Sequence, residues 1–178
     1  MTELASKIDK LIRNVPDFPK PGIMFKDITP VIQNGAVFNE IIRAMAEKVK
    51  ASGATLIAGI ESRGFIFGSA LAHELGYGFI LLRKPGKLPW KTVRATYQLE
   101  YGSDAIEMHE DAVKPGDKVV IVDDLLATGG TATAAACLIK EAGAEVKQVL
   151  FAIELEFLNG REKLRTAGFP AIDSLLKY

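Results

Sequence analysis

The stretch KVVIVDDLLATGGT, residues 118–131, has the pattern of a strand, a loop and a helix in direct succession. Apolar residues at 119–122 predict a buried strand, and two adjacent acids, Asp123 and Asp124, stand where that strand is expected to end. A loop of small residues follows, and a helix is predicted from 131 to 142. In an open parallel sheet, ligands bind outside the carboxyl ends of the strands. The acids and the loop are therefore the first place to expect a functional site.

A similar unit precedes this one along the chain. It has an apolar segment at 55–60, a polar turn at 61–64, a predicted helix from 65 to 75 and a second apolar segment at 79–82. The unit that contains the two acids ends with another apolar segment, at 146–153. Strands that are apolar on both faces and connected by helices indicate a parallel sheet with helices on each side. The predicted fold class is therefore α/β, with a central, mostly parallel sheet flanked by helices.

Two segments lie outside this pattern. Apolar residues at helical spacing predict an amphipathic helix over residues 3–15, and the prolines that follow exclude regular structure there. A further helix is predicted over 37–50, ending near Gly53. Residues 84–114 are mostly polar and are expected to be mobile, with 97–101 as one arm of a hairpin.

Composition limits the class of protein. The chain has 178 residues, which suits one domain, and its 22 Lys and Arg balance 22 Asp and Glu, so that its formal net charge is zero. Nucleic acids and anionic membranes attract proteins that have a surplus of cations, so neither is expected as a partner. Cys137 is the only cysteine, which excludes an intramolecular disulfide. The first residues lack a signal-peptide core and no apolar run is long enough to span a membrane, so we expect a cytoplasmic location.

The loop at 127–131 has the features of a phosphate-binding loop. Gly129 and Gly130 allow the backbone to approach a ligand closely, and successive backbone N–H groups point into such a loop. The hydroxyls of Thr128 and Thr131 add donors, and the N-terminus of the following helix favours an anion. The alternative is a tight turn from strand to helix, with Thr131 as the N-cap.

The two acids narrow the choice of ligand. Paired carboxylates would repel a plain phosphate, but they suit a ligand that also carries hydroxyl groups, a developing positive charge or a divalent cation. A ribose 5-phosphate has a phosphate at one end and vicinal hydroxyls at the other. A Walker loop is excluded, because the glycines at 59 and 64 are followed by Phe65 and Ile66 instead of Lys and Ser or Thr.

At these residues, 123–131, the chain resembles the phosphoribosyl-pyrophosphate signature of the type I phosphoribosyltransferases. The resemblance to the members of that family that use adenine extends over essentially the whole chain. Six further motifs carry it, in the same order: DFPKPG at 17–22, FKDITP at 25–30, ESRGF at 61–65, RKPGKLP at 83–89, LEYG at 99–102 and NGREKL at 159–164. The resemblance implies a single domain over residues 1–178 with the type I phosphoribosyltransferase fold, a small N-terminal hood at about 1–35 and a flexible catalytic loop within about 84–114.

The resemblance also implies a reaction. Adenine would displace pyrophosphate from C1′ of phosphoribosyl pyrophosphate to give AMP, with Mg²⁺ as cofactor, in purine salvage. In this family Mg²⁺ bridges oxygens of the substrate, so no protein side chain is expected to bind it directly and contact would be through water. A homodimer is implied as well.

Roles for individual residues follow from matching motif positions. The ribose and its 5-phosphate would be bound by Asp123, Asp124, Ala127, Thr128, Gly129, Gly130 and Thr131. Pyrophosphate would be bound by Arg63, Arg83, Lys84 and Lys87. These last three begin a run of five cations between 83 and 94 that contains no acid, for which the alternative is a solvated basic loop.

The remaining matches concern the base. Glu100 matches the family's general acid/base, which would take the proton that adenine loses from its imidazole ring; the alternative is a loop carboxylate with a structural partner. Adenine would be bound by Met24, Phe25, Lys26 and Leu155, for which the alternative is plain core packing. Two rival functions stay open: a sister enzyme that uses another purine base, and a non-catalytic, nucleotide-sensing regulator of the same fold. Glu100 and the cationic stretch favour catalysis.

Overall fold

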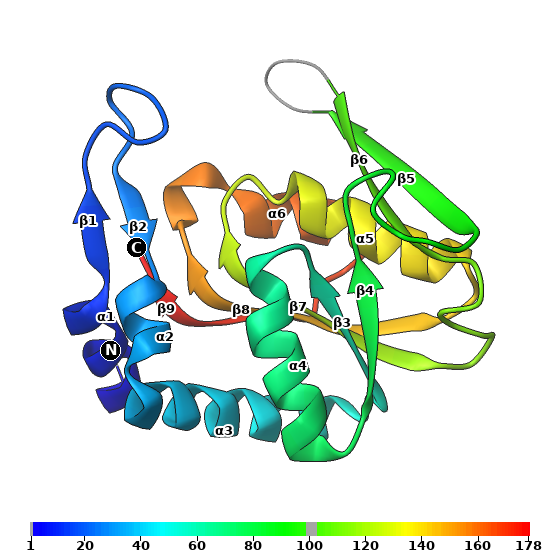
Figure 1. Ribbon diagram of the computed structural model, residues 1–178, viewed down its shortest axis with the longest axis horizontal. Helices are drawn as coiled ribbons and strands as arrows, with labels where there is room; N and C mark the ends of the chain where they lie inside the picture. Colours follow the sequence, from blue (N-terminus) through cyan, green and yellow to red (C-terminus); the bar gives the residue numbers. More distant parts are fainter. Residues whose placement is uncertain (1, 99–102) are drawn as a thin grey trace.

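The computed structural model describes residues 2–98 and 103–178 (Figure 1). Its centre is a five-stranded sheet in the order β4-β3-β7-β8-β9, and every neighbouring pair in it is parallel. The strands are β3 (Leu56–Ile60), β4 (Gly78–Leu82), β7 (Lys118–Leu126), β8 (Glu145–Glu154) and β9 (Ile172–Lys177). The predicted α/β class and parallel sheet are confirmed; the edge strand β9 was not predicted.

The apolar run in β7 is explained by burial on both faces of the sheet. Val119 and Ile121 point into one apolar core, and Val120 and Val122 point into the other. All four side chains are fully buried. A strand that is covered on both faces shows no polar alternation, and this is why the sequence indicated a parallel sheet.

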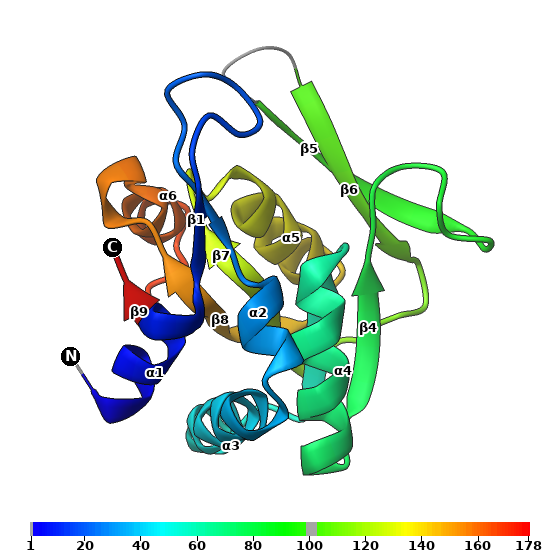
Figure 2. The same cartoon turned by 60° about the vertical axis from the view of Figure 1, so that its left-hand side comes forward.

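Helices cover both faces of the sheet (Figure 2). One core contains α1 (Glu3–Leu11), α3 (Gly35–Ser52) and α4 (Arg63–Leu75). The other contains α5 (Gly130–Glu141) and α6 (Gly160–Thr166). Two short helices, α2 (Thr29–Gln33) and the 3₁₀ helix η1 (Glu156–Leu158), complete the described set. No helix within residues 2–98 and 103–178 has the length and apolar character that crossing a membrane requires.

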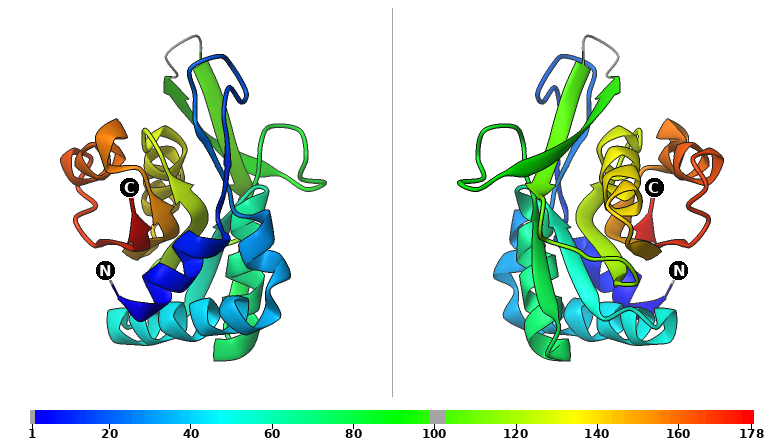
Figure 3. Two further views of the ribbon diagram at one scale, coloured as in Figure 1. Left: turned by 90° about the vertical axis from the view of Figure 1, so that its left-hand side faces the viewer. Right: turned by 90° about the vertical axis from the view of Figure 1, so that its right-hand side faces the viewer.

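The predicted hood is a two-stranded antiparallel hairpin made of β1 (Arg13–Val15) and β2 (Phe25–Asp27). It stands above the carboxyl edge of the sheet (Figures 1 and 3). The helix predicted over residues 3–15 was wrong in its last turn, because α1 ends at Leu11 and Arg13 pairs with Asp27. Pro16 contributes to this outcome, since a residue before proline disfavours helical geometry.

A second antiparallel ribbon rises on the same side of the molecule (Figure 3). It consists of β5 (Thr92–Gln98) and β6 (Ser103–His109), and it adds Tyr97, Ile106 and Met108 to the core around α5. The hairpin arm predicted at 97–101 is confirmed at residues 97 and 98, which belong to β5, and its remaining residues lie outside those that the structure describes. The mobility expected for residues 84–114 stays a prediction.

Candidate active site

A pocket of about 90 Å³ lies where β7 ends and α5 begins. It is lined by Asp123 and by every residue from 125 to 132. The expectation that β7 ends before the acids was wrong, because its pairing with β8 continues through Asp123↔Phe151 to Leu126↔Glu154. The acids are therefore held by the sheet itself, three and two residues before the strand ends at Leu126.

The predicted phosphate loop has a backbone that requires glycine at Gly129. This residue has φ 76°, in the left-handed region, and a Cβ atom built on it would lie 2.6 Å from the carbonyl oxygen of Gly160. Gly129 is also the N-cap of α5, so the alternative in which Thr131 caps the helix was wrong. The Thr131 hydroxyl instead donates to the hydroxyl oxygen of Tyr97 at 3.0 Å. The first N–H groups of α5 remain without partners inside the helix, as the binding of an anion requires.

The two acids have different environments. Asp124 is 6 % exposed and accepts a hydrogen bond from Nε of Arg63, the first residue of α4. Burial lowers the pKa of Arg63, but the Asp124 carboxylate outweighs that effect and the pKa is raised. Asp123 accepts from the backbone N–H of Asp124 at 2.9 Å. Burial, and then the charge of Asp124, raises the pKa of Asp123 well above its usual range.

Arg63 connects the acids to the hood. Its guanidinium carbon lies 6.0 Å from the ring centroid of Phe25, and that ring makes an edge contact with Phe18 at 5.1 Å between centroids. The residue predicted to lie beside the base and a residue predicted to bind pyrophosphate are therefore neighbours. The hydrogen bond from Arg63 to Asp124 connects both of them to the acid pair of β7.

The other residues predicted to bind adenine lie on β2 and just after β8. Met24, the residue directly before β2, is 52 % exposed. The Nζ of Lys26 donates to the side-chain oxygen of Asn14 at 2.9 Å and lies 3.8 Å from the ring centroid of Tyr178. Leu155 follows β8, and its N–H donates to the carbonyl oxygen of Leu126, a pocket residue, at 2.9 Å. Leu155 is thus attached directly to the wall of the pocket.

Three of the predicted pyrophosphate cations follow β4, and two of them converge on one acid. Arg83 donates to Glu61 through Nε at 3.2 Å, and the ammonium of Lys87 donates to Glu61 at 2.5 Å. The backbone N–H of Lys84 adds a third contact with that carboxylate at 3.1 Å. Burial favours protonation of Glu61, but Lys87 and Arg83 outweigh it and lower the pKa of Glu61 to about 2. Glu61 was not predicted to have a role from the sequence, where its signal was an acid directly after a buried strand.

The side chain of Lys84 takes a different partner and reaches the phosphate loop indirectly. Its ammonium donates to the hydroxyl of Tyr97 at 2.7 Å and pairs with Asp104. Because the same hydroxyl accepts from Thr131, Tyr97 connects the ribbon, the cationic segment and the loop. Glu100, the predicted general acid/base, lies outside the described residues.

The phosphoribosyl transferase domain family matches residues 29–165 of the chain. The chain is 53% identical to the adenine phosphoribosyltransferase of Roseiflexus sp. (strain RS-1) over 175 residues, which cover 98% of this chain and 100% of that protein. The crystal structure of the enzyme from Thermoanaerobacter pseudethanolicus is similar with a TM-score of 0.93 and 50% identity, covering 98% and 99% of the two chains. The enzyme from Saccharomyces cerevisiae, solved with D-2,5-dideoxy-2,5-imino-altritol 1,6-bisphosphate and adenine, gives a TM-score of 0.92 at 39% identity, covering 99% and 100%.

Proposed function

This chain belongs to the phosphoribosyltransferase family and, within it, to the adenine phosphoribosyltransferases, and from this membership we propose how its site works. A ring nitrogen of adenine forms a bond to C1′ of phosphoribosyl pyrophosphate. The bond from C1′ to pyrophosphate breaks, its electron pair leaves with pyrophosphate, and AMP is formed. The observation that carries the proposal is that a carboxylate of β7, Asp123, and a glycine-rich loop at a helix N-terminus line the same pocket.

The sugar phosphate is the part of the substrate that this pocket fits. We assign the 5-phosphate to the backbone N–H groups and hydroxyls of residues 127–131, where the N-terminus of α5 favours an anion. The ribose hydroxyls are assigned to Asp123 and Asp124. Their negative charge also favours positive charge on the sugar ring as pyrophosphate leaves. Holding both ends of the ribose restricts C1′ to the position where adenine reaches it.

Pyrophosphate is assigned to Arg63, Arg83, Lys84 and Lys87. Each of them already contacts a carboxylate, which holds it at the carboxyl edge of the sheet before the substrate arrives. An ammonium group has three N–H donors, so Lys84 and Lys87 have donors for a phosphate beyond those used by their acid partners.

Adenine is assigned to the hood side of the pocket. Phe25 and Leu155 would contact the faces of the base, and the backbone groups of Met24 and Lys26 would bond its edge. The closeness of Phe25 to Arg63, and of Leu155 to Leu126, supports this placement next to the ribose acids. Glu100 is the base that we propose accepts the imidazole proton of adenine, which raises rates by roughly 10²–10⁴-fold in comparable cases.

Mg²⁺ belongs to the proposal as a partner of the substrate. Asp123 and Asp124 offer oxygen ligands, which Mg²⁺ prefers, but within residues 2–98 and 103–178 no three His, Cys, Asp or Glu side chains gather at one place. This fits a Mg²⁺ ion that takes its ligands from the substrate and from water, and that the acid pair would contact through water. When bound, the ion would neutralise charge on the departing pyrophosphate.

The proposal is tested by supplying the protein with Mg²⁺, phosphoribosyl pyrophosphate and each purine base in turn, and by measuring nucleotide and pyrophosphate. We expect AMP from adenine and far slower turnover of hypoxanthine and guanine. Turnover of those bases but not of adenine would show a sister enzyme, and no turnover of any base would show a regulator. A homodimer and a cytoplasmic location are further parts of the proposal, carried by family membership.

A further inference from the structure

The motif NGREKL, residues 159–164, has no role in the function proposed above, yet it forms the start of α6 and packs against the phosphate loop. Gly160 is buried there. A Cβ atom built on Gly160 would lie 2.2 Å from the carbonyl oxygen of Ala127 and 2.9 Å from the backbone nitrogen of Gly129. Only glycine allows these two backbones to approach so closely, and α6 is thus a direct neighbour of the loop.

Lys163 lies one helical turn further along α6, and its ammonium reaches over the same loop. The Nζ atom is 3.6 Å from the position that a Cβ on Gly130 would take. Gly130 lines the pocket and is the first residue of α5. The positive charge of Lys163 therefore lies close to the N-terminus of α5, next to the pocket.

Lys163 differs in its ion pairing from the four cations that are assigned to pyrophosphate. Arg63, Arg83, Lys84 and Lys87 each pair with a carboxylate. Lys163 pairs with no acid among residues 2–98 and 103–178, and its side chain is exposed to solvent. Its ammonium can therefore turn to an anion in the pocket without breaking an ion pair with a described residue.

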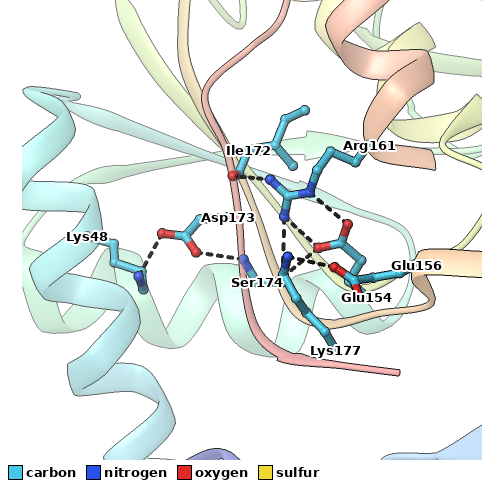
Figure 4. A network of polar contacts seen from close by, with 8 residues as sticks. All are labelled: Lys48, Glu154, Glu156, Arg161, Ile172, Asp173, Ser174 and Lys177. Carbon is cyan, nitrogen blue, oxygen red and sulfur yellow. Dashed lines mark hydrogen bonds and ion pairs between the residues drawn. The ribbon is translucent and has the colours of Figure 1, made fainter. Parts of the chain in front are cut away.

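An ion pair between Arg161 of α6 and the buried Glu154 fixes the position of this helix (Figure 4). Arg161 donates to both carboxylate oxygens of Glu154, at 2.8 and 2.5 Å, and to the carbonyl oxygen of Ile172 at 2.7 Å. Glu154 is 2 % exposed and accepts a further hydrogen bond from Ser174 at 2.6 Å. These contacts tie the first turn of α6 to β8 and β9, so that the helix is held at the loop.

We propose that Lys163 binds the 5-phosphate of the substrate and of AMP. A phosphate monoester carries close to two negative charges, whereas a helix N-terminus supplies only about half a positive charge. Asp123, which lines the same pocket, and its neighbour Asp124 repel the phosphate. A cation beside Gly130 offsets that repulsion, and Lys163 is placed to supply it. This inference rests on the proposed function, because it takes the 5-phosphate to lie in the loop.

The test compares the affinities for AMP and adenosine by calorimetry, because the two ligands differ only by the 5-phosphate. In the wild-type protein we expect AMP to bind more tightly than adenosine. Lys163→Met is expected to weaken AMP binding about tenfold, the size of one charge-assisted hydrogen bond, and to leave adenosine binding unchanged. Lys163→Arg retains the charge and is expected to keep most of the AMP affinity. The control is Arg165→Met, which removes an exposed cation from the same helix and is expected to change neither affinity.

Each outcome has a definite meaning once equal melting temperatures show that the variants are folded. If the wild-type protein prefers AMP and Lys163→Met keeps that preference, the inference is wrong and the proposed function stands. If Arg165→Met weakens AMP binding as much as Lys163→Met, the effect is one of overall charge and the inference is also wrong. If the wild-type protein binds AMP no better than adenosine and makes no AMP, the proposed function fails and the inference fails with it.

Discussion

The Nε atom of Arg63 donates a hydrogen bond to the carboxylate of Asp124, and this contact connects the first residue of α4 to β7. Because of this contact, the adjacent acids Asp123 and Asp124 differ in their electrostatic environment. Asp124 has its charge balanced by a guanidinium, whereas Asp123 is left with a pKa raised by burial and by its neighbour. The ligand that completes the site must therefore interact favourably with Asp123, as ribose hydroxyls or a cationic sugar do.

Loss of the Asp124 charge is expected to destabilise the protein. Asp124→Asn leaves Arg63 partly buried without its partner, so the free energy of unfolding should fall by about 1–3 kcal/mol. The measurement is urea unfolding of Asp124→Asn, Arg63→Met and the double variant. Because the two side chains interact, we expect the double variant to be less destabilised than the sum of the single ones. Strictly additive losses would contradict the interaction.

Loss of the Asp123 charge is expected to stabilise the ligand-free protein, in contrast to loss of the Asp124 charge. Its folded-state pKa lies above its ordinary value, so the folded chain binds the proton more tightly than the unfolded chain, and stability falls as the pH rises from that ordinary value to the folded pKa. Asp123→Asn removes this penalty. We expect a higher melting temperature for the ligand-free variant above that window, together with a large loss of kcat/KM. A lower melting temperature would show that the carboxylate stabilises the fold.

Glu61 gives a pH dependence of the usual sign for an ion-paired acid. Lys87 and Arg83 lower its pKa to about 2 from an ordinary value of 4.5, so the stabilisation is complete above 4.5 and is lost as the pH falls toward 2. Glu61→Gln should therefore be less stable than the wild type at neutral pH, with a difference that shrinks between pH 4.5 and 2. Unfolding free energies measured across that range check this. A difference that is constant with pH would exclude the ion-pair explanation.

Gly160 is expected to tolerate no side chain. In Gly160→Ala the methyl group would meet the Ala127 carbonyl oxygen at 2.2 Å, and because that atom is backbone, the phosphate loop must move. We expect a KM for phosphoribosyl pyrophosphate raised at least about tenfold, since small displacements of positioning groups are costly. Gly35→Ala is the matched control, because a Cβ at Gly35 meets nothing within 4 Å. Equal KM values in the two variants would show that the loop does not depend on this contact.

The sequence predicted what depends on local pattern and missed what depends on contacts between distant segments. The apolar run of β7 and the loop after it were read correctly, because burial on both faces leaves a continuous signal. The predicted end of β7 was wrong, since the last residues of the strand are held by pairing with β8. Glu61 was missed because its partners Arg83 and Lys87 are 22 and 26 residues away along the chain.

The N-terminal segment and α6 show the same limit. The helical pattern of residues 3–15 continues past Leu11, but pairing with β2 takes over at Arg13. The motif at 159–164 was recognised without a role, because nothing local shows that Gly160 abuts Gly129 or that Lys163 lies over Gly130. Local patterns therefore indicated the acid pair and the glycine-rich loop, to which we assign the ribose and the 5-phosphate, while the groups that support them emerged only from the fold.

The most direct test of the site is a crystal structure of the protein with AMP. We predict that the 5-phosphate lies against the backbone of residues 128–131 beside Lys163, that the ribose hydroxyls contact Asp123 and Asp124, and that adenine lies between Phe25 and Leu155. AMP bound with its phosphate elsewhere, for example on the cations between 83 and 94, and with no ligand in the pocket at the end of β7, would contradict the assignment of this pocket as the active site.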